Sequence, residues 1–183
     1  MTAAKNLFML ATIFVIAVLV IGSPTFAVKD KKDKKGKKNN VEVKAEDGLV
    51  VITDTVDDVK VKEGGRVILE GATVNGKIDA KGAYRVELRF GTTVDGDVKI
   101  KESTLVRVVD SVIGGKLKIE KNDSGDTPIN INRNEISGYV KVEKNTASEI
   151  RINNNIIGGD LKGKENDAVI VKSQNIIGGD DEL

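Results

Sequence analysis

From Val41 onward, apolar and polar residues alternate along the chain, and almost no stretch has the 3.6-residue period of a helix. A period of two is typical of β-strands that bury one face. Short segments of Val, Ile and Leu recur at residues 41–43, 50–52, 59–61, 67–69, 86–88, 106–108, 129–131 and 150–152, and a further copy at 169–171 is out of step by one residue. The pattern predicts an all-β body built from many short strands.

A second unit, apolar-x-Gly-x-apolar-x-apolar, repeats between these segments. It begins at residues 74–80, returns at 94–100, 113–119 and 136–142, and is shortened at 157–163 and 177–180. Its glycines are Gly76, Gly96, Gly115, Gly138, Gly159 and Gly179, with steps of 20, 19, 23, 21 and 20 residues. A fixed period near 20 with short strands predicts a solenoid, because stacked coils share one core.

We therefore predict a right-handed parallel β-helix of about six to seven coils over residues 41–183, with Val, Ile and Leu inward. Inward positions include Ile119, Ile131 and Val140. The alternative is a sandwich or barrel of short strands, but the turns of those folds do not normally recur at one spacing with the same residues around them. Antiparallel pairing between residues 86–88 and 94–100 would contradict the solenoid.

Glycine and asparagine are the candidate corner residues. The six glycines are expected at sharp corners with positive φ, where a Cβ carries a penalty. Asn134, Asn155 and Asn175 each lie two residues before the Ile of the glycine unit, with steps of 21 and 20 residues. We predict that they stack in a hydrogen-bonded ladder, the alternative being that Asn tolerates a left-handed turn. Earlier coils carry Thr92 and Ser111 there, so the ladder should fade toward the N-terminus.

The first 40 residues have a different composition. Lys5 precedes an uncharged run over residues 7–21, and the segment 22–27 ends in Thr-Phe-Ala. This order predicts a signal peptide over residues 1–27 with cleavage after Ala27, or otherwise an uncleaved membrane anchor. Residues 28–40 hold seven Lys and two Asp, and predict a disordered linker that could attach to anionic lipid or an acidic polymer.

Charge and composition exclude several functions. Residues 41–183 hold 21 Lys and Arg against 26 Asp and Glu, a net charge of −5, and an acidic body argues against a nucleic-acid partner. The chain has no Cys, His or Trp, which excludes disulfides, thiolate zinc sites and imidazole chemistry. Aromatic residues make up only 3%, so aromatic platforms for sugars are scarce. We predict no cofactor, no metal and no enzymatic activity.

Two weaker candidates for chemistry remain. The carboxylates of Asp79, Asp95, Asp97 and Asp110 could form an acid–base set on a groove, but no second coil repeats the Asp95–Asp97 pair. The loop Asn122–Asp126 offers oxygen ligands for calcium and lies in the longest coil, although its spacing matches neither an EF-hand loop nor the nonapeptide Gly-Gly-x-Gly-x-Asp repeat. A solvated face and an ordinary turn are the simpler interpretations.

The repeated glycine unit over residues 59–180 resembles right-handed parallel β-helix proteins, and in particular short-coil bacterial solenoids such as the polymer-forming bactofilins. The resemblance implies a scaffold that self-associates. Bactofilins are cytoplasmic or inner-membrane proteins, whereas this chain begins with an export signal. The leading prediction is therefore an exported or envelope scaffold or spacer. The alternatives are a carbohydrate-binding or carbohydrate-active β-helix and a membrane-tethered bactofilin-like polymer.

The two ends of the predicted solenoid suggest how copies could associate. Lysines from Lys29 to Lys38 precede one end, and Asp180, Asp181 and Glu182 lie at the other. Opposite charges should attract unlike ends, and a contact that does not close grows into a filament. We predict weak head-to-tail association that is sensitive to salt.

Overall fold

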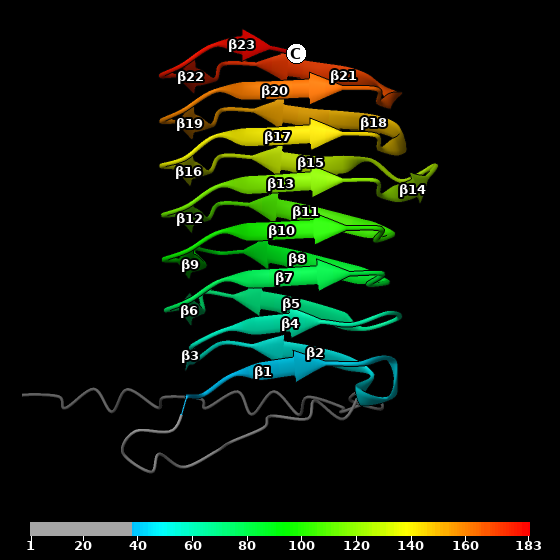
Figure 1. Ribbon diagram of the computed structural model, residues 1–183, viewed down its shortest axis with the longest axis vertical. Helices are drawn as coiled ribbons and strands as arrows, with labels where there is room; N and C mark the ends of the chain where they lie inside the picture. The colour runs from blue at the N-terminus through cyan, green and yellow to red at the C-terminus, as the bar shows by residue number, and fades with distance from the viewer. Residues whose placement is uncertain (1–37) are drawn as a thin grey trace, which may run out of the picture.

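The computed structural model describes residues 38–183, which form a parallel β-solenoid of seven coils (Figure 1). Every strand pair in this part of the chain is parallel, so the predicted solenoid architecture is confirmed and the antiparallel alternative is wrong. The predicted signal peptide and most of the lysine-rich linker lie outside the described residues. Within residues 38–183 there is no helix long and apolar enough to cross a membrane.

Each coil contributes one strand to each of three sheets. Sheet A contains β1 (Val41–Val43), β4 (Val59–Val61), β7 (Ile78–Lys81), β10 (Val98–Lys101), β13 (Leu117–Glu120), β17 (Val140–Glu143), β20 (Leu161–Lys164) and β23 (Asp181–Glu182). Sheet B contains β2 (Leu49–Ile52), β5 (Arg66–Glu70), β8 (Arg85–Arg89), β11 (Leu105–Val109), β15 (Ile129–Asn132), β18 (Thr146–Asn153) and β21 (Asp167–Ser173), with a short extra strand, β14 (Asp123–Gly125). Sheet C contains the two-residue strands β3 (Thr55–Val56), β6 (Thr73–Val74), β9 (Thr93–Val94), β12 (Val112–Ile113), β16 (Glu135–Ile136), β19 (Ile156–Ile157) and β22 (Ile176–Ile177).

The core is one continuous column of branched apolar side chains between the three sheets. Equivalent residues lie in register from coil to coil, as in Leu88, Val108 and Ile131 of sheet B. The predicted inward residues Ile119, Ile131 and Val140 are each 0% exposed. Burying one apolar face per strand holds the coils together, because a single coil has no partner for its inward side chains.

Two local features depart from the regular coil. A one-turn 3₁₀ helix, Ala45–Asp47, lies between β1 and β2 in the first coil. In the longest coil, the extra residues protrude at the corner around β14, which projects from the stack in Figure 1. Both insertions lie at corners, where extra residues leave the stacking of the three sheets intact.

The last coil closes the core with charged residues. Ile170 of β21 lies opposite the buried Ile150, so the one-residue offset seen in the sequence leaves Val169 and Val171 opposite the outward Glu149 and Arg151. In that register Lys172 lies opposite the buried Ile152, and Asp181 of β23 lies opposite the buried Leu161. The Lys172 ammonium contacts both Asp181 carboxylate oxygens at 2.7 Å. Positions that are apolar in earlier coils therefore hold an ion pair here.

Candidate functional site

The predicted asparagines lie one above another at the corner between sheets B and C. The Asn155 side-chain amide donates to Asn175 Oδ1 at 2.9 Å and to the Ile131 carbonyl at 2.8 Å, and Asn134 Nδ2 donates to Asn155 Oδ1 at 3.0 Å. The backbone N–H of Asn134 also donates to Asn155 Oδ1. Asn134 and Asn155 are buried. Each asparagine thus satisfies backbone groups that the corner would otherwise leave buried without partners.

Toward the N-terminus this corner column changes composition. Asn134 Oδ1 accepts the backbone N–H of Ser111 at 3.0 Å. One coil earlier, the buried Thr92 hydroxyl contacts the carbonyl oxygens of Leu69 and Arg89 at 3.0 and 2.9 Å. Asparagine amides that contact the next coil therefore give way to hydroxyl groups of smaller side chains. The column ends at Ala72, which has no polar group in its side chain.

A second ladder, which the sequence analysis missed, lies at the corner between sheets A and B. Asn122 Nδ2 donates to Asn145 Oδ1 at 2.9 Å, and Asn145 Nδ2 donates to Asn166 Oδ1 at 3.0 Å. Asn122 is 1% exposed and belongs to this ladder, so the interpretation of its side chain as a calcium ligand is wrong. Steps of 23 and 21 residues between these asparagines were the available signal.

Residues with left-handed backbone precede both ladders. Nine non-glycine residues have φ between 50° and 58°: Phe90, Glu102, Asp110, Lys121, Arg133, Lys144, Asn154, Glu165 and Gln174. All except Phe90 come directly before a Ser or Asn of a corner column. In an earlier coil Gly71, with φ of 63°, precedes Ala72. The left-handed residue turns the chain so that the next side chain points inward.

The six repeat glycines have a different role from the one predicted. None of Gly76, Gly96, Gly115, Gly138, Gly159 and Gly179 is among the residues with positive φ, so the expected left-handed conformation is wrong. They stack between sheets C and A, where the Gly138 N–H donates to the Gly115 carbonyl at 2.9 Å. A Cβ on Gly138 would lie 2.7 Å from that carbonyl oxygen. Close approach of successive coils, rather than backbone conformation, requires glycine.

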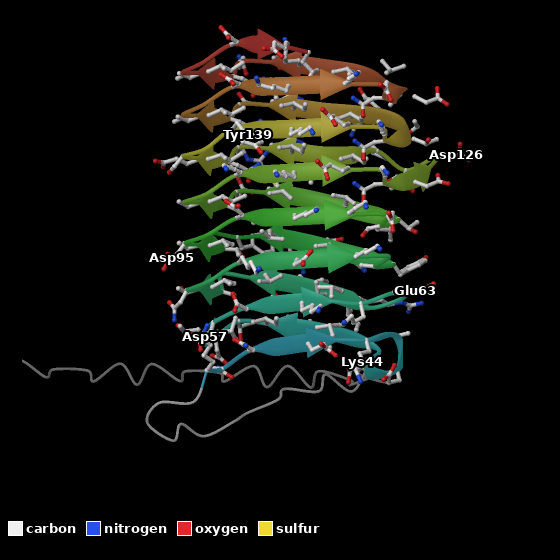
Figure 2. All side chains as sticks on the ribbon, viewed as in Figure 1. Lys44, Asp57, Glu63, Asp95, Asp126 and Tyr139 are labelled. Carbon is white, nitrogen blue, oxygen red and sulfur yellow. The ribbon has the colours of Figure 1, made fainter. Side chains whose placement is uncertain are left out.

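The candidate catalytic carboxylates do not converge. Asp79 lies on the outer face of sheet A, and Asp95 projects from the edge of the solenoid opposite Asp126 (Figure 2). Asp97 Oδ1 accepts the Lys116 backbone N–H at 2.9 Å. Asp110 pairs with the Arg133 guanidinium at 2.6 Å, and the hydrogen bond lowers the pKa of Asp110 below its usual range. Across residues 38–183, no three acidic residues are placed to hold a metal ion.

Several charged groups on the outer face of sheet B pair with one another. Glu87, only 8% exposed, pairs with Arg85 at 2.7 Å and with Arg89 at 3.5 Å, and Glu70 pairs with Arg89 at 3.2 Å. The Arg66 guanidinium lies 4.6 Å from the centre of the Tyr84 ring. Arg66, Arg85 and Arg89 are therefore engaged within the molecule.

Cations also cover the other two aromatic rings of the described chain. Arg89 lies 5.1 Å from the centre of the Phe90 ring, and Lys116 and Lys118 lie 5.2 and 5.7 Å from that of Tyr139. A hydrogen bond with Tyr139 raises the pKa of Lys118. These cation–π contacts occupy ring faces that a sugar would need for stacking.

The outer face of sheet A carries lysines in direct register. Lys99, Lys118, Lys141 and Lys162 lie opposite one another on four successive strands. We call these four residues the lysine column. A second column of outward residues lies beside it on the same face. In this second column Lys101 lies opposite Glu120, and Glu143 lies opposite Lys164. All six arginines lie on sheet B strands or, for Arg133, directly after β15, so the cations of the sheet A strands are all lysines.

The two ends of the described solenoid differ. At the N-terminal end the inward Val43 is 0% exposed, whereas at the C-terminal end the inward Ile170 is 37% exposed. The acidic residues there are largely paired within the chain, Asp181 with Lys172 and Glu182 with Lys162 at 3.5 Å. The Asp180 N–H donates to Asp160, and this hydrogen bond lowers the pKa of the Asp160 carboxyl.

No protein-family model, no curated protein and no solved structure matches the chain. The β-solenoid fold therefore rests on the structure itself, and kinship with bactofilins stays a prediction.

Proposed function

We propose that the protein is an exported, non-enzymatic structural scaffold or spacer of the cell envelope or surface. The observation that carries the proposal is the single core running through seven coils, surrounded by faces whose charged groups are paired or dispersed rather than gathered in a cleft. Such a body holds its two ends at a fixed separation. We further infer right-handed winding, the usual sense of a parallel crossover.

Export is tested on the native protein. Sequencing its N-terminus and locating it by cell fractionation should give Val28 as the first residue, in an exported fraction. A chain that keeps residues 1–27 and fractionates with the cytoplasmic face of a membrane would favour the bactofilin-like alternative. Hydrolysis of a polysaccharide by the purified chain would overturn the non-enzymatic scaffold.

Self-association is the second part of the proposal. We infer weak head-to-tail contact between the lysine-rich N-terminal end and the C-terminal end. Because Asp181 and Glu182 are already paired, the inward Ile170, which is 37% exposed at this end, adds an apolar component to the charge attraction. Sedimentation of the mature chain should show oligomers at low salt that dissociate as the Debye length falls below about 8 Å. A strict monomer at high concentration in low salt, or oligomers indifferent to salt and to deletion of residues 28–40, would contradict it.

A further inference from the structure

The lysine column places four like charges in direct register, although Lys141 pairs with Glu120 and Glu143 and Lys162 pairs with Asp160 and Glu182. Lys99, Lys118, Lys141 and Lys162 stand directly opposite one another on β10, β13, β17 and β20. Adjacent strands lie about 4.8 Å apart, so the column spans about 14 Å. Like charges directly opposite one another destabilise a sheet. A solenoid can avoid this by alternating sign, as the Lys101–Glu120 pairing on the same face does.

The charge of the whole face has the same sign. On the outer face of sheet A, the lysines number eight (Lys60, Lys81, Lys99, Lys101, Lys118, Lys141, Lys162 and Lys164) and the acids five (Glu42, Asp79, Glu120, Glu143 and Glu182). The face therefore carries +3, although residues 41–183 together carry −5. Among the described residues, Lys60 and Lys99 make no ion pair. The strands of this sheet lie one above another across the front of Figure 1.

We propose that the outer face of sheet A binds a linear acidic polysaccharide along the solenoid axis, with its carboxylates against the lysine column. The inference is independent of self-association and gives the proposed scaffold a partner in the envelope. A polymer that carries one carboxylate per sugar offers single charges at regular intervals, which suits single ammonium groups repeated once per coil. Its negative charge would also offset the repulsion between neighbouring lysines.

Other polyanions fit the face less well. The two-pronged guanidinium of arginine matches phosphate and carboxylate alike, and the six arginines lie on or beside sheet B, so the face offers single ammonium contacts only. A membrane-binding face combines lysines with exposed apolar side chains, whereas the exposed Val, Ile and Phe side chains of the described chain lie on sheets B and C or at the corner after β8.

The test uses the full-length chain and polygalacturonate, with neutral dextran as the polymer control, in titration calorimetry at low and high salt. The triple variant Lys99→Gln, Lys118→Gln, Lys141→Gln should bind polygalacturonate at least about tenfold more weakly. The matched variant Arg66→Gln, Arg107→Gln, Arg151→Gln loses the same net charge from sheet B and should stay within about twofold of the wild type. A third variant replaces the seven lysines of residues 28–40 by Gln and should keep the wild-type affinity for polygalacturonate.

Three outcomes would overturn the proposal. Equal losses in the two triple variants would mean a response to net charge alone. A loss confined to the variant of residues 28–40 would assign binding to that segment. Duplex DNA or anionic vesicles that bind sheet A at least as tightly as polygalacturonate would identify a different class of ligand.

Folding is checked separately by circular dichroism. The sheet A variant should melt close to the wild type, because the like-charge repulsion that it removes offsets the loss of the Lys141 pairs with Glu120 and Glu143. If it does melt earlier, polygalacturonate binding is compared instead between the single variants Lys99→Glu and Arg107→Glu. Lys99 has no ion pair among the described residues, so its substitution breaks none. Unchanged binding by a folded Lys99→Glu variant would then count against the proposal.

Discussion

At the residue scale, the corner asparagines are the polar groups on which the core depends most. Asn155 is 0% exposed and makes side-chain contacts to the coils on both sides, whereas Asn175 lies half-buried at the end of the same ladder. A buried group left without a hydrogen-bond partner costs about 1–3 kcal/mol. The cost of removing an asparagine should therefore depend on its place in the ladder.

We expect Asn155→Ala to lower the free energy of unfolding by about 2–4 kcal/mol, because it leaves several buried backbone groups unpaired. Asn175→Ala should cost clearly less, since it interrupts only one end of the ladder. Denaturant unfolding of both variants measures the difference. Equal losses would show that the ladder adds nothing beyond the local turn.

The repeat glycines give a second test at this scale. Gly138→Ala would place a Cβ 2.7 Å from the Gly115 carbonyl oxygen, where backbone lies in the way, and should cost about 2 kcal/mol or more. Gly91→Ala is the control, because Gly91 has φ of 79° with open space around its Cβ position, and should cost about 1–2 kcal/mol. If thermal melting finds Gly91→Ala the more damaging change, close approach is not the reason for the repeated glycine.

At the element scale, the stacking of strands in register predicts large penalties for inward truncations. Ile131 of β15 is 0% exposed and lies between Val108 of β11 and Ile152 of β18. Ile131→Ala should cost about 2–5 kcal/mol through the cavity that it leaves. Lys99→Ala, on an outer face and without an ion pair in the described chain, should change stability little. Chemical unfolding that gave the two variants the same midpoint would contradict the assigned register.

Sequence reasoning recovered the strands better than the corners. The period near 20 residues and the alternation of Val, Ile and Leu with polar residues sufficed to predict parallel coils and the inward side chains, because the same pattern recurs in every coil. The pattern did not separate sheet C from sheet A, since both strands fall within one glycine unit, as with β9 and β10. The left-handed residues also escaped prediction, because Glu102, Lys121 and Lys144 are charged residues that give no turn signal.

At the scale of the whole molecule, the two ends determine whether copies stack into a continuous solenoid. Two inward positions of the last coil hold Lys172 and Asp181, which lie opposite the buried Ile152 and Leu161 of the coil before, while Ile177 and Leu183 pack against the core. Inward-pointing charge is a known means of blocking further pairing at a sheet edge. Burying this ion pair under another coil would cost desolvation energy that the pair itself recovers only in part. This cost is consistent with the weak head-to-tail contact that we propose.

The double variant Lys172→Ile, Asp181→Leu should convert weak association into tight association. It restores at this end the residue types found one coil earlier, so that another copy can dock its own apolar end without burying charge. Sedimentation velocity should show larger oligomers that persist at high salt, because the contact would depend on apolar burial rather than on attraction between charges. The control Lys164→Ile, Glu182→Leu adds the same residue types at outward positions of sheet A, and should not produce oligomers that lengthen along the solenoid axis in electron micrographs. A double variant as monomeric as the wild type would show that the ion pair does not limit assembly.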